Sequence, residues 1–600
     1  MPGTGRKGQD ARRLIAGAAV LFLLTAGVFL PALKAGYIWD DDTFLTENPL
    51  ILRDDGLRGF WFSTEPPDYF PLTSTMLWIE WRLWRGSPAG FHAVNILLHA
   101  LSAVFLWFVL RRLKVPGAWA GALFFGIHPV AVETVAWITE RKNTLPMLFS
   151  MAAVICFLRA DDNGRRRDYA LSVFLFLLAL LSKTSVVMLP FVLLLCVWRR
   201  HGRVSRRDLT RTLPFFALSF ILGCVTVWYQ AHSAIGRDVI RTDGFASRLA
   251  VAGQAVWFYL YKAAVPLRLC FVYDFPATGR LGVASFLPLA ALAAVFAVLW
   301  RWRRGPAGGV LFALTCYILM LAPALGFVNI YFMKYALVSD HWQYFSLPAF
   351  TALIAAGWAR LQEKAGRRGA WIFPAAAAAV FLLLAALSWR QTLVYRDSET
   401  LWRHTLSLNS GSGLAHNNLG RILRERGAAQ EAAGHFRKAL EAFPGDVFVL
   451  QNLAAAVHDL GRPEEAERYY REALEVMPES VLARTGLGRV LADLGALPEA
   501  EACFREAIAQ APAHGEAWAG LGLVSARRGR LPEAREYLEK ALALGEDTAA
   551  AHGNLANVLA ETGLYDEALV HYRKALEREP GNEAIRRNMG IAQRRAAESR

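Results

Sequence analysis

Cysteine is scarce in this chain of 600 residues, and its spacing supports neither a disulfide framework nor a metal site. Five of the six cysteines lie in or beside apolar segments, and the sixth, Cys503, stands alone. Small secreted scaffolds held by disulfides and zinc-binding modules are therefore excluded.

A basic stripe of the kind that binds nucleic acid is also lacking, although the formal net charge is +15. Residues 401–600 contain 25 Lys and Arg and 28 Asp and Glu, whereas residues 1–400 contain 41 and 23. The basic excess thus flanks long apolar runs, which is how membrane proteins fix their topology. A nucleic-acid footprint would instead mark a soluble face, so no nucleic-acid partner is predicted.

Apolar residues make up 54% of the chain, and they come in long blocks bounded by arginine. This composition is typical of a membrane protein. The first block, at 14–33, follows four basic residues and has no small-x-small cleavage site before Lys34. It is predicted to be a retained signal anchor rather than a cleaved signal peptide, with the N-terminus in the cytoplasm.

Eight further apolar segments are candidates to cross a bilayer, which needs about 20 residues of helix. They lie at 92–110, 116–134, 145–158, 212–230, 284–300, 309–327, 342–359 and 370–389, and 145–158 is short. Residues 169–198 have arginine clusters on both sides. They are therefore predicted to form a hairpin of two short helices with Lys183 at its outer tip.

The topology depends on residues 249–266, which either span the membrane or lie along its outer surface in a loop from 231 to 283. If they lie outside the bilayer, about 11 crossings remain. The cytoplasmic stretches then contain 24 Lys and Arg and 6 Asp and Glu, while the rest of residues 1–400 contains 17 of each. We expect this arrangement because it follows the positive-inside rule, and it places the C-terminal region outside the cytoplasm.

A period of 34 residues runs through the C-terminal region. Alanine recurs in two series, Ala432, Ala466, Ala500, Ala534 and Ala568, and Ala439, Ala473, Ala507, Ala541 and Ala575. Small residues at these places let two antiparallel helices pack closely, which is the signature of tetratricopeptide repeats. Five repeats are predicted at 413–582, as an α-solenoid with a capping helix at 583–600. Such surfaces bind an extended peptide or a protein, and a passive spacer is the alternative.

Three adjacent carboxylates, Asp40, Asp41 and Asp42, follow the first apolar segment directly. Their mutual repulsion is costly at a membrane interface unless a cation, a substrate or a catalytic task offsets it. One of them is predicted to act as the general base for an acceptor hydroxyl. Alternatively, Asp40 and Asp41 hold a divalent cation that bridges a phosphate, or the loop is merely solvated. No other cofactor is predicted.

A second polar stretch, expected on the same side of the membrane, contains His128, Glu133, Arg141 and Lys142. Basic residues at an outer face, where the topology rule disfavours them, indicate a bound anion such as a lipid phosphate. Arg141 and Lys142 are therefore predicted to bind the donor phosphate, with His128 and Glu133 in support. Pairing of these cations with Glu133 or Glu140 is the alternative.

Two more groups are predicted at this face. Lys183 is a lone cation between apolar runs, so it either reaches the phosphate or extends to the interface. The segment that opens the crossing at 342–359 contains Asp340, His341 and Tyr344. His341 is a candidate phosphate contact, and Asp340 and Tyr344 are candidate supporting residues.

Taken in order, these motifs resemble the polytopic GT-C glycosyltransferases. More narrowly, the chain resembles the transmembrane and tetratricopeptide-repeat O-mannosyltransferases and their bacterial relatives. The segments that carry this likeness are YIWDDD, YFPLTSTMLWIEWRLW, FHAVNILLHALSAV, GIHPVAVETVAWITERKN and LLSKTS, followed by the repeat array. The resemblance implies an all-α, GT-C-like membrane domain at 1–390, a linker at 391–412 and then the repeats.

In that family the acidic pair after the first helix is catalytic, which corresponds to Asp40, Asp41 and, as an alternative, Asp42. The late loop of the family has arginine after its acidic residue, where this chain has His341. A neutral imidazole binds phosphate less firmly than a guanidinium does. Either His341 is protonated, or the anion contact has moved to the basic residues at 141, 142 or 183.

The resemblance implies transfer of mannose or a similar hexose from a polyprenyl-phosphate donor to a protein acceptor, with inversion, on the extracytoplasmic side. The expected partners are that lipid-linked sugar, membrane lipid and a protein or peptide bound by the repeats. The alanine-rich and arginine-rich composition fits a multi-pass enzyme of a bacterial inner membrane. A non-enzymatic membrane scaffold or assembly factor is the alternative. A transporter ranks last because the chain has no duplicated halves.

Overall fold

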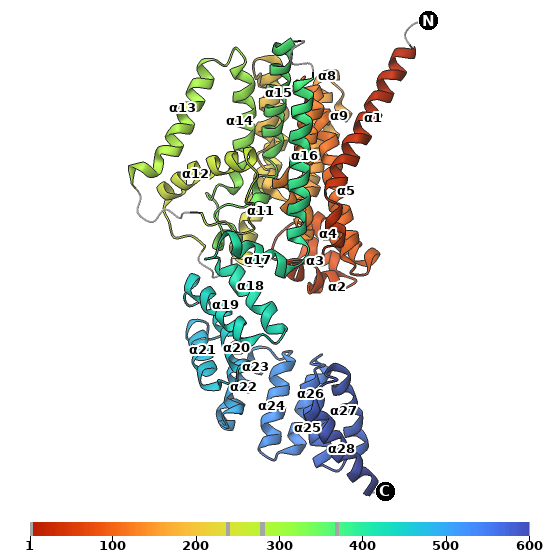
Figure 1. Cartoon of the computed structure of the whole chain (residues 1–600), viewed down its shortest axis with the longest axis vertical. Coiled ribbons are helices and arrows are strands. Elements are labelled where there is room, and N and C mark those ends of the chain that lie inside the picture. Colours follow the sequence, from red (N-terminus) through yellow and green to blue (C-terminus); the bar gives the residue numbers. More distant parts are fainter. Residues whose placement is uncertain (1–3, 236–239, 276–281, 367–370, 599–600) are drawn as a thin grey trace. The chain divides into compact units, whose positions relative to one another are not determined.

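The computed structural model describes residues 4–235, 240–275, 282–366 and 371–598, and within these ranges it contains helices and no strand (Figure 1). The prediction of an all-α chain is confirmed for this part. The chain divides into two compact units, Met1–Ser410 and Gly411–Arg600, called unit 1 and unit 2 below.

Unit 1 is a bundle of helices with lengths that suit a bilayer. Its longer helices are α1 (Thr4–Val28), α5 (Pro88–Arg112), α8 (Arg141–Asn163), α9 (Arg166–Ser182), α10 (Leu189–His201), α11 (Arg206–Tyr229), α12 (Phe245–Ala264), α13 (Leu287–Arg301), α14 (Ala307–Leu321), α15 (Leu347–Ala365) and α16 (Ile372–Thr392). In the described part, eight helical segments are long and apolar enough to cross a membrane, or nine if a bent pair counts as one span. The predicted eleven crossings also include α9, which has 17 residues, and α15, which ends in charged residues. The number eleven therefore stays a prediction.

Two segments differ from the sequence-based expectation. The crossing expected at 116–134 is broken into α6 (Ala118–Gly126) and α7 (Val132–Ala136), which are bent by 46°. Pro129 lies at the break, because proline cannot continue the helix there. The segment expected to be short, 145–158, belongs to α8, which has 23 residues.

Glycine at the end of α6 is required by close packing. A Cβ atom at Gly126 would lie 2.3 Å from the hydroxyl of Thr25, so no larger residue fits between α6 and α1. This contact fixes the start of the polar stretch that follows α6.

Helix α12 forms the segment 249–266 whose position decided the predicted topology. Figure 1 shows it running across the direction of α14 and α16, and it is not one of the candidate spans. Its inner side is buried, for example at Val251 and Tyr259. This is the geometry expected of a helix that lies along a membrane surface.

The loop after α1 and the segment after α16 complete unit 1. The loop forms α2 (Pro49–Leu52), α3 (Gly56–Phe62) and α4 (Pro71–Trp84). The segment expected as a linker at 391–412 includes α17 (Ser398–Leu408), in which Trp402 is buried. Asn409 donates a hydrogen bond to the carbonyl of Val272 at 3.1 Å. The compact unit thus continues through α17 to Ser410.

Unit 2 is an α-solenoid of helix pairs. The pairs are α18 (Gly413–Glu425) and α19 (Ala429–Ala442), α20 (Val447–Asp459) and α21 (Pro463–Val476), α22 (Val481–Asp493) and α23 (Leu497–Gln510), α24 (Gly515–Arg527) and α25 (Leu531–Ala543), and α26 (Ala549–Glu561) and α27 (Tyr565–Arg578). Helix α28 (Glu583–Glu598) packs on the last pair. All ten alanines of the two predicted series are fully buried, which confirms the reading of the 34-residue period.

Large side chains fill the grooves that the small residues create. A Cβ atom at Gly488 or Gly520 would lie 2.9 or 2.3 Å from the ring of Phe504. We expect Phe504→Ala to lower the unfolding free energy by about 3–5 kcal/mol, as large-to-small core changes do. Urea unfolding of residues 411–600 measures it, with Phe448→Ala as control because Phe448 is 57% exposed. Equal losses in the two variants would contradict the packing argument.

Candidate functional site

The aspartate trio begins in a tight turn that turns Asp41 inward. Trp39 has a φ of 44°, a left-handed conformation that is rare for a tryptophan. The carboxylate of Asp41 then accepts the backbone N–H of Ile38 at 2.9 Å and that of Thr139 at 3.0 Å. Asp41 is fully buried, so it joins the first loop to the stretch before α8.

Aromatic packing holds the strained residue in place. The ring of Trp39 lies 5.3 Å from the rings of Trp137 and Phe271, 5.4 Å from that of Phe332 and 6.4 Å from that of Trp402. Backbone strain persists only where the surroundings over-determine it. These four rings from distant segments therefore fix the direction in which the next residue, Asp40, points.

Asp40 faces a partly open polar cluster. One of its carboxylate oxygens accepts the Thr139 hydroxyl at 2.9 Å, and the other lies 3.8 Å from the ammonium nitrogen of Lys142. Their side chains are 17% and 14% exposed, so both are within reach of a ligand. Lys142 also lies 3.4 Å from the buried carboxylate of Glu140.

The two aspartates differ in proton affinity. Burial raises the pKa of Asp40 to about 6, against the charge of Lys142, which lowers it. Burial and then the charge of Asp40 raise the pKa of Asp41 to about 8. Asp40 is therefore ionised at neutral pH and able to take a proton. Asp41, in contrast, is buried and keeps its proton.

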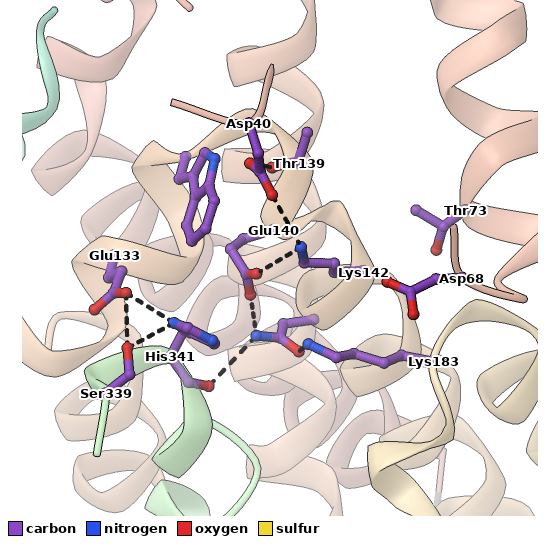
Figure 2. A network of polar contacts seen from close by, with 12 residues as sticks. Asp40, Asp68, Thr73, Glu133, Thr139, Glu140, Lys142, Lys183, Ser339 and His341 are labelled. Carbon is purple, nitrogen blue, oxygen red and sulfur yellow. Dashed lines mark hydrogen bonds and ion pairs between the residues drawn. The ribbon is translucent and has the colours of Figure 1, made fainter. Parts of the chain in front are cut away.

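Two more charged residues, Asp68 and Lys183, complete the polar cluster, which Figure 2 shows. Asn143 donates to Glu140 and accepts from the ammonium group of Lys183 at 2.9 Å. Asp68 faces both lysines, and its pKa is raised by burial but lowered by their charges. The cluster thus contains two partly exposed carboxylates, at positions 40 and 68, and two partly exposed ammonium groups, at 142 and 183.

His341 lies at the inner edge of the cluster. Its Nδ1 lies 2.7 Å from a carboxylate oxygen of Glu133 and 2.8 Å from the hydroxyl of Ser339. Burial lowers the pKa of His341 to about 3, so the imidazole is neutral. This favours the alternative in which the anion contact has moved to the basic residues, and the cations that reach the cluster are Lys142 and Lys183.

Arg141 does not enter the cluster, which corrects the prediction that it binds phosphate. It is fully buried, and its guanidinium donates to Glu80, to Asn95 at 2.6 Å and to the carbonyl of Phe91 at 2.9 Å. These bonds fasten the start of α8 to α4 and α5. Pairing of these cations with Glu133 or Glu140 was the alternative; it occurs for Lys142, which lies 3.4 Å from Glu140, whereas Arg141 pairs with Glu80.

Three other predicted residues lie outside the cluster. Asp42 accepts the backbone N–H of Thr43 at 2.6 Å and its hydroxyl at 3.1 Å. His128 is buried with Nε2 3.0 Å from the carbonyl of Ala263, and the hydroxyl of Tyr344 is buried 2.8 Å from the ring of His99. Each has a local structural partner, so none is brought to the site.

Asp340 is buried behind His341. Its carboxylate accepts the hydroxyl of Tyr273 at 2.9 Å, and burial raises the pKa of Asp340 to about 7. Asp340 thus binds Tyr273 inside the protein and does not reach the partly exposed side chains of the cluster, at positions 40, 68, 142 and 183.

The buried pair of Arg141 and Glu80 predicts a structural effect. Arg141→Met leaves Glu80 buried without its partner, and we expect a loss of about 3–5 kcal/mol, the usual cost of breaking such a pair. Adding Glu80→Leu should recover most of it, because the orphaned charge is gone. The melting temperature of the detergent-purified chain measures both. If Arg141 bound the donor instead, the single variant would melt normally and lose ligand.

The donor set does not favour the predicted divalent cation. Both oxygens of Asp41 already accept backbone N–H groups, and Lys142 lies beside Asp40. In the described ranges, no group of three or more His, Cys, Asp or Glu residues could hold a metal ion. A second ammonium group, that of Lys183, lies in the same cluster beside Asn143.

Asp68 and Asn143 were not predicted as site residues. Asp68 accepts a hydrogen bond from Gln230, 162 residues away. Asn143 joins two charged groups, Glu140 and Lys183, but carries no charge itself. The one sequence signal was its place directly after Lys142 in the polar stretch.

Comparison with known proteins matches both parts of the chain. Residues 66–229 match the family described as dolichyl-phosphate-mannose-protein mannosyltransferase. Residues 412–479, 457–524 and 513–580 match tetratricopeptide repeats. The chain is similar to the protein O-mannosyl-transferases. This confirms the resemblance inferred from the motifs.

Curated relatives show how far this likeness extends. A protein O-mannosyl-transferase of Caenorhabditis elegans is 22% identical over 462 residues, covering 73% of this chain and 64% of the relative. One from Homo sapiens is 24% identical over 508 residues, covering 74% and 56%. This chain thus spans somewhat less than two thirds of the length of these relatives. Among solved structures, a thermophilic TPR protein of Thermus thermophilus is 28% identical, with a TM-score of 0.28, and the match covers 30% of this chain and 98% of that one.

Proposed function

We propose that unit 1 transfers mannose or a similar hexose from a polyprenyl-phosphate donor to a hydroxyl group of a protein. The observation that carries the proposal is the pairing of a partly exposed carboxylate, Asp40, with the partly exposed ammonium group of Lys142 at 3.8 Å, beside Lys183. A general base and a cationic phosphate contact are the two groups that such a transfer needs. The dolichyl phosphate mannose in the description of the matched family supports this donor class.

The transfer is a single displacement. The acceptor hydroxyl gives its proton to Asp40 while its oxygen forms a bond to the anomeric carbon. The bond from that carbon to the phosphate oxygen breaks, and its electron pair leaves with the phosphate. Attack from the face opposite the leaving group inverts the anomeric configuration.

Proton transfer and phosphate departure assist each other in this arrangement. Lys142 is attracted to Asp40 only while Asp40 is ionised. When Asp40 takes the proton, this attraction falls, just as the departing phosphate gains negative charge. Lys142 is then free to pair with the phosphate, together with Lys183. The hydrogen bond from Lys183 to Asn143 at 2.9 Å keeps the second ammonium group in the cluster before the phosphate leaves.

Unit 2 is proposed to bind the protein acceptor, because repeat solenoids present extended surfaces to peptides and proteins. The transfer is proposed to take place outside the cytoplasm of a multi-pass inner-membrane protein. The distribution of Lys and Arg supports this side of the membrane, because it favours the opposite face for the cytoplasm.

Two measurements test the proposal. The purified chain should bind a synthetic polyprenyl-phosphate mannose, and deletion of its gene should remove O-linked hexose from proteins seen by glycoproteomics. No donor binding together with an unchanged glycoproteome would favour the non-enzymatic scaffold instead.

The pH dependence of transfer follows from the same groups. The base form of Asp40 exists above its pKa of about 6, so the rate should fall about tenfold per pH unit below that value. Burial lowers the pKa of Lys183, so the alkaline limb should begin below the range of an ordinary lysine. A pH–rate profile of the purified enzyme measures both limbs. An acid limb near the ordinary value of an aspartate, about 4, would count against Asp40.

A further inference from the structure

Unit 1 contains a cavity of about 290 Å³ between α5, α8, α10, α14 and α15. Its lining is apolar along most of its length, with Leu, Val, Met, Ala and Phe side chains from all five helices. Three charged residues line it, Lys114, Arg199 and Arg360, and all three are cations. The cavity therefore combines an apolar interior with positive charge.

The three cations lie at the end of the bundle away from the polar cluster. Lys114 follows the last turn of α5, and Arg199 lies in the last turn of α10. Arg360 lies 13 residues into α15, or about 20 Å along the helix from its start, which follows the His341 loop. A ligand at these cations is therefore separate from one at Lys142.

Some basic residues at this end of the bundle have acidic partners. At the same end of the bundle, Arg112 pairs with Asp162 at 2.7 Å, and Arg200 and Arg211 pair with Asp161 at 2.7 and 3.3 Å.

The side chains of Lys114, Arg199 and Arg360, in contrast, form no ion pair or hydrogen bond with any residue that the structure describes, and all three are exposed. None of the residues that line the cavity is acidic, so the positive charge of the three side chains is open to an anion. An anion bound beside them is attracted by all three charges.

We infer that this cavity binds an acidic glycerophospholipid, with its phosphate at Lys114, Arg199 and Arg360 and an acyl chain in the apolar interior. Basic pockets between membrane helices recognise anionic head groups in this way, and each basic residue near the head group strengthens the attraction. A zwitterionic lipid brings no net negative charge to the three cations. The inference does not depend on the proposed transfer reaction.

Native mass spectrometry of the full chain, with phosphatidylglycerol and phosphatidylcholine in equal amounts, tests the head group. The chain should retain phosphatidylglycerol at least about tenfold better, since three cations face its net charge. Changing Lys114, Arg199 and Arg360 together to Gln should abolish this preference. The matched control changes Arg166, Arg203 and Arg207 to Gln, which removes the same charge from exposed residues at this end of the bundle but outside the cavity. It should keep the preference.

A second variant tests the acyl chain. Ala352 lines the cavity and is 8% exposed, so Ala352→Trp should fill it and reduce retention of both lipids. Equal retention of the two lipids by the unchanged protein, or an equal loss in the control triple variant, would overturn the inference. Displacement of phosphatidylglycerol by an equal amount of polyprenyl phosphate would also overturn it, because the cavity would then belong to the donor. No outcome involves sugar transfer, so failure here leaves the proposed function standing.

Discussion

Replacing Asp40 by Asn should lower hexosyl transfer about a hundred- to ten-thousand-fold, the range that a general base contributes. Asparagine keeps the size of the side chain and can still accept the hydrogen bond from Thr139, which is 2.9 Å long. It cannot take the proton of the acceptor hydroxyl. Glycoproteomics of deletion cells that express each variant at equal membrane levels measures the loss.

Asp42→Asn is the matched control for this variant. It removes the same charge two positions further along, but the carboxylate of Asp42 bonds to Thr43 and not to the cluster. Transfer should therefore be retained. Asp41→Asn is no substitute, because Asp41 closes the turn through two backbone N–H groups and its loss disturbs the position of Asp40. Equal losses in the Asp40 and Asp42 variants would remove Asp40 from the mechanism.

The aspartate trio shows where prediction from sequence ended. Composition and charge indicated that these residues carry chemistry, but three adjacent carboxylates are alike as a pattern. Their separate environments come from the left-handed turn at Trp39 and from Thr139, which lies almost a hundred residues further along. No local period encodes that contact.

Arg141 and Lys142 illustrate a second limit. Adjacent residues on a helix point about 100° apart, so one of two neighbouring cations can face a site while the other faces the core. The sequence marked both as anion contacts. Glu80 and Asn95, on α4 and α5, decide which one turns inward, and the pattern around 141 gives no sign of them.

Local periodicity, in contrast, predicted the repeats and most membrane helices well. Each helix pair of unit 2 buries alanine at the same two places of the repeat, so the signal recurs every 34 residues. The break between α6 and α7 was missed although Pro129 stood in the sequence. The apolar residues on both sides of Pro129 together have the length of one membrane crossing. The prediction therefore gave this length more weight than the helix-breaking effect of the proline.

Replacing both Lys142 and Lys183 by Gln should lower transfer about a hundred- to a thousand-fold, the usual effect of removing preorganised charge from a developing anion. Both substitutions keep a side chain of similar length that donates hydrogen bonds, so the loss of transfer measures the effect of the missing charge. Lys34→Gln is the control, because Lys34 is an exposed cation at the same end of α1 as the aspartate loop. Unchanged transfer by a normally expressed double variant would place the phosphate elsewhere.

The single variants should differ from each other in their pH profiles. The charge of Lys142 lowers the pKa of Asp40, so Lys142→Gln should move the acid limb of the pH–rate profile above about 6. Lys183 is hydrogen-bonded to Asn143 and is not among the main influences on Asp40. Lys183→Gln should therefore lower the rate and leave the acid limb in place. A lysine that acted only by stabilising the fold would lower the rate without moving either limb, so the displaced limb identifies Lys142 as the cation that faces the base.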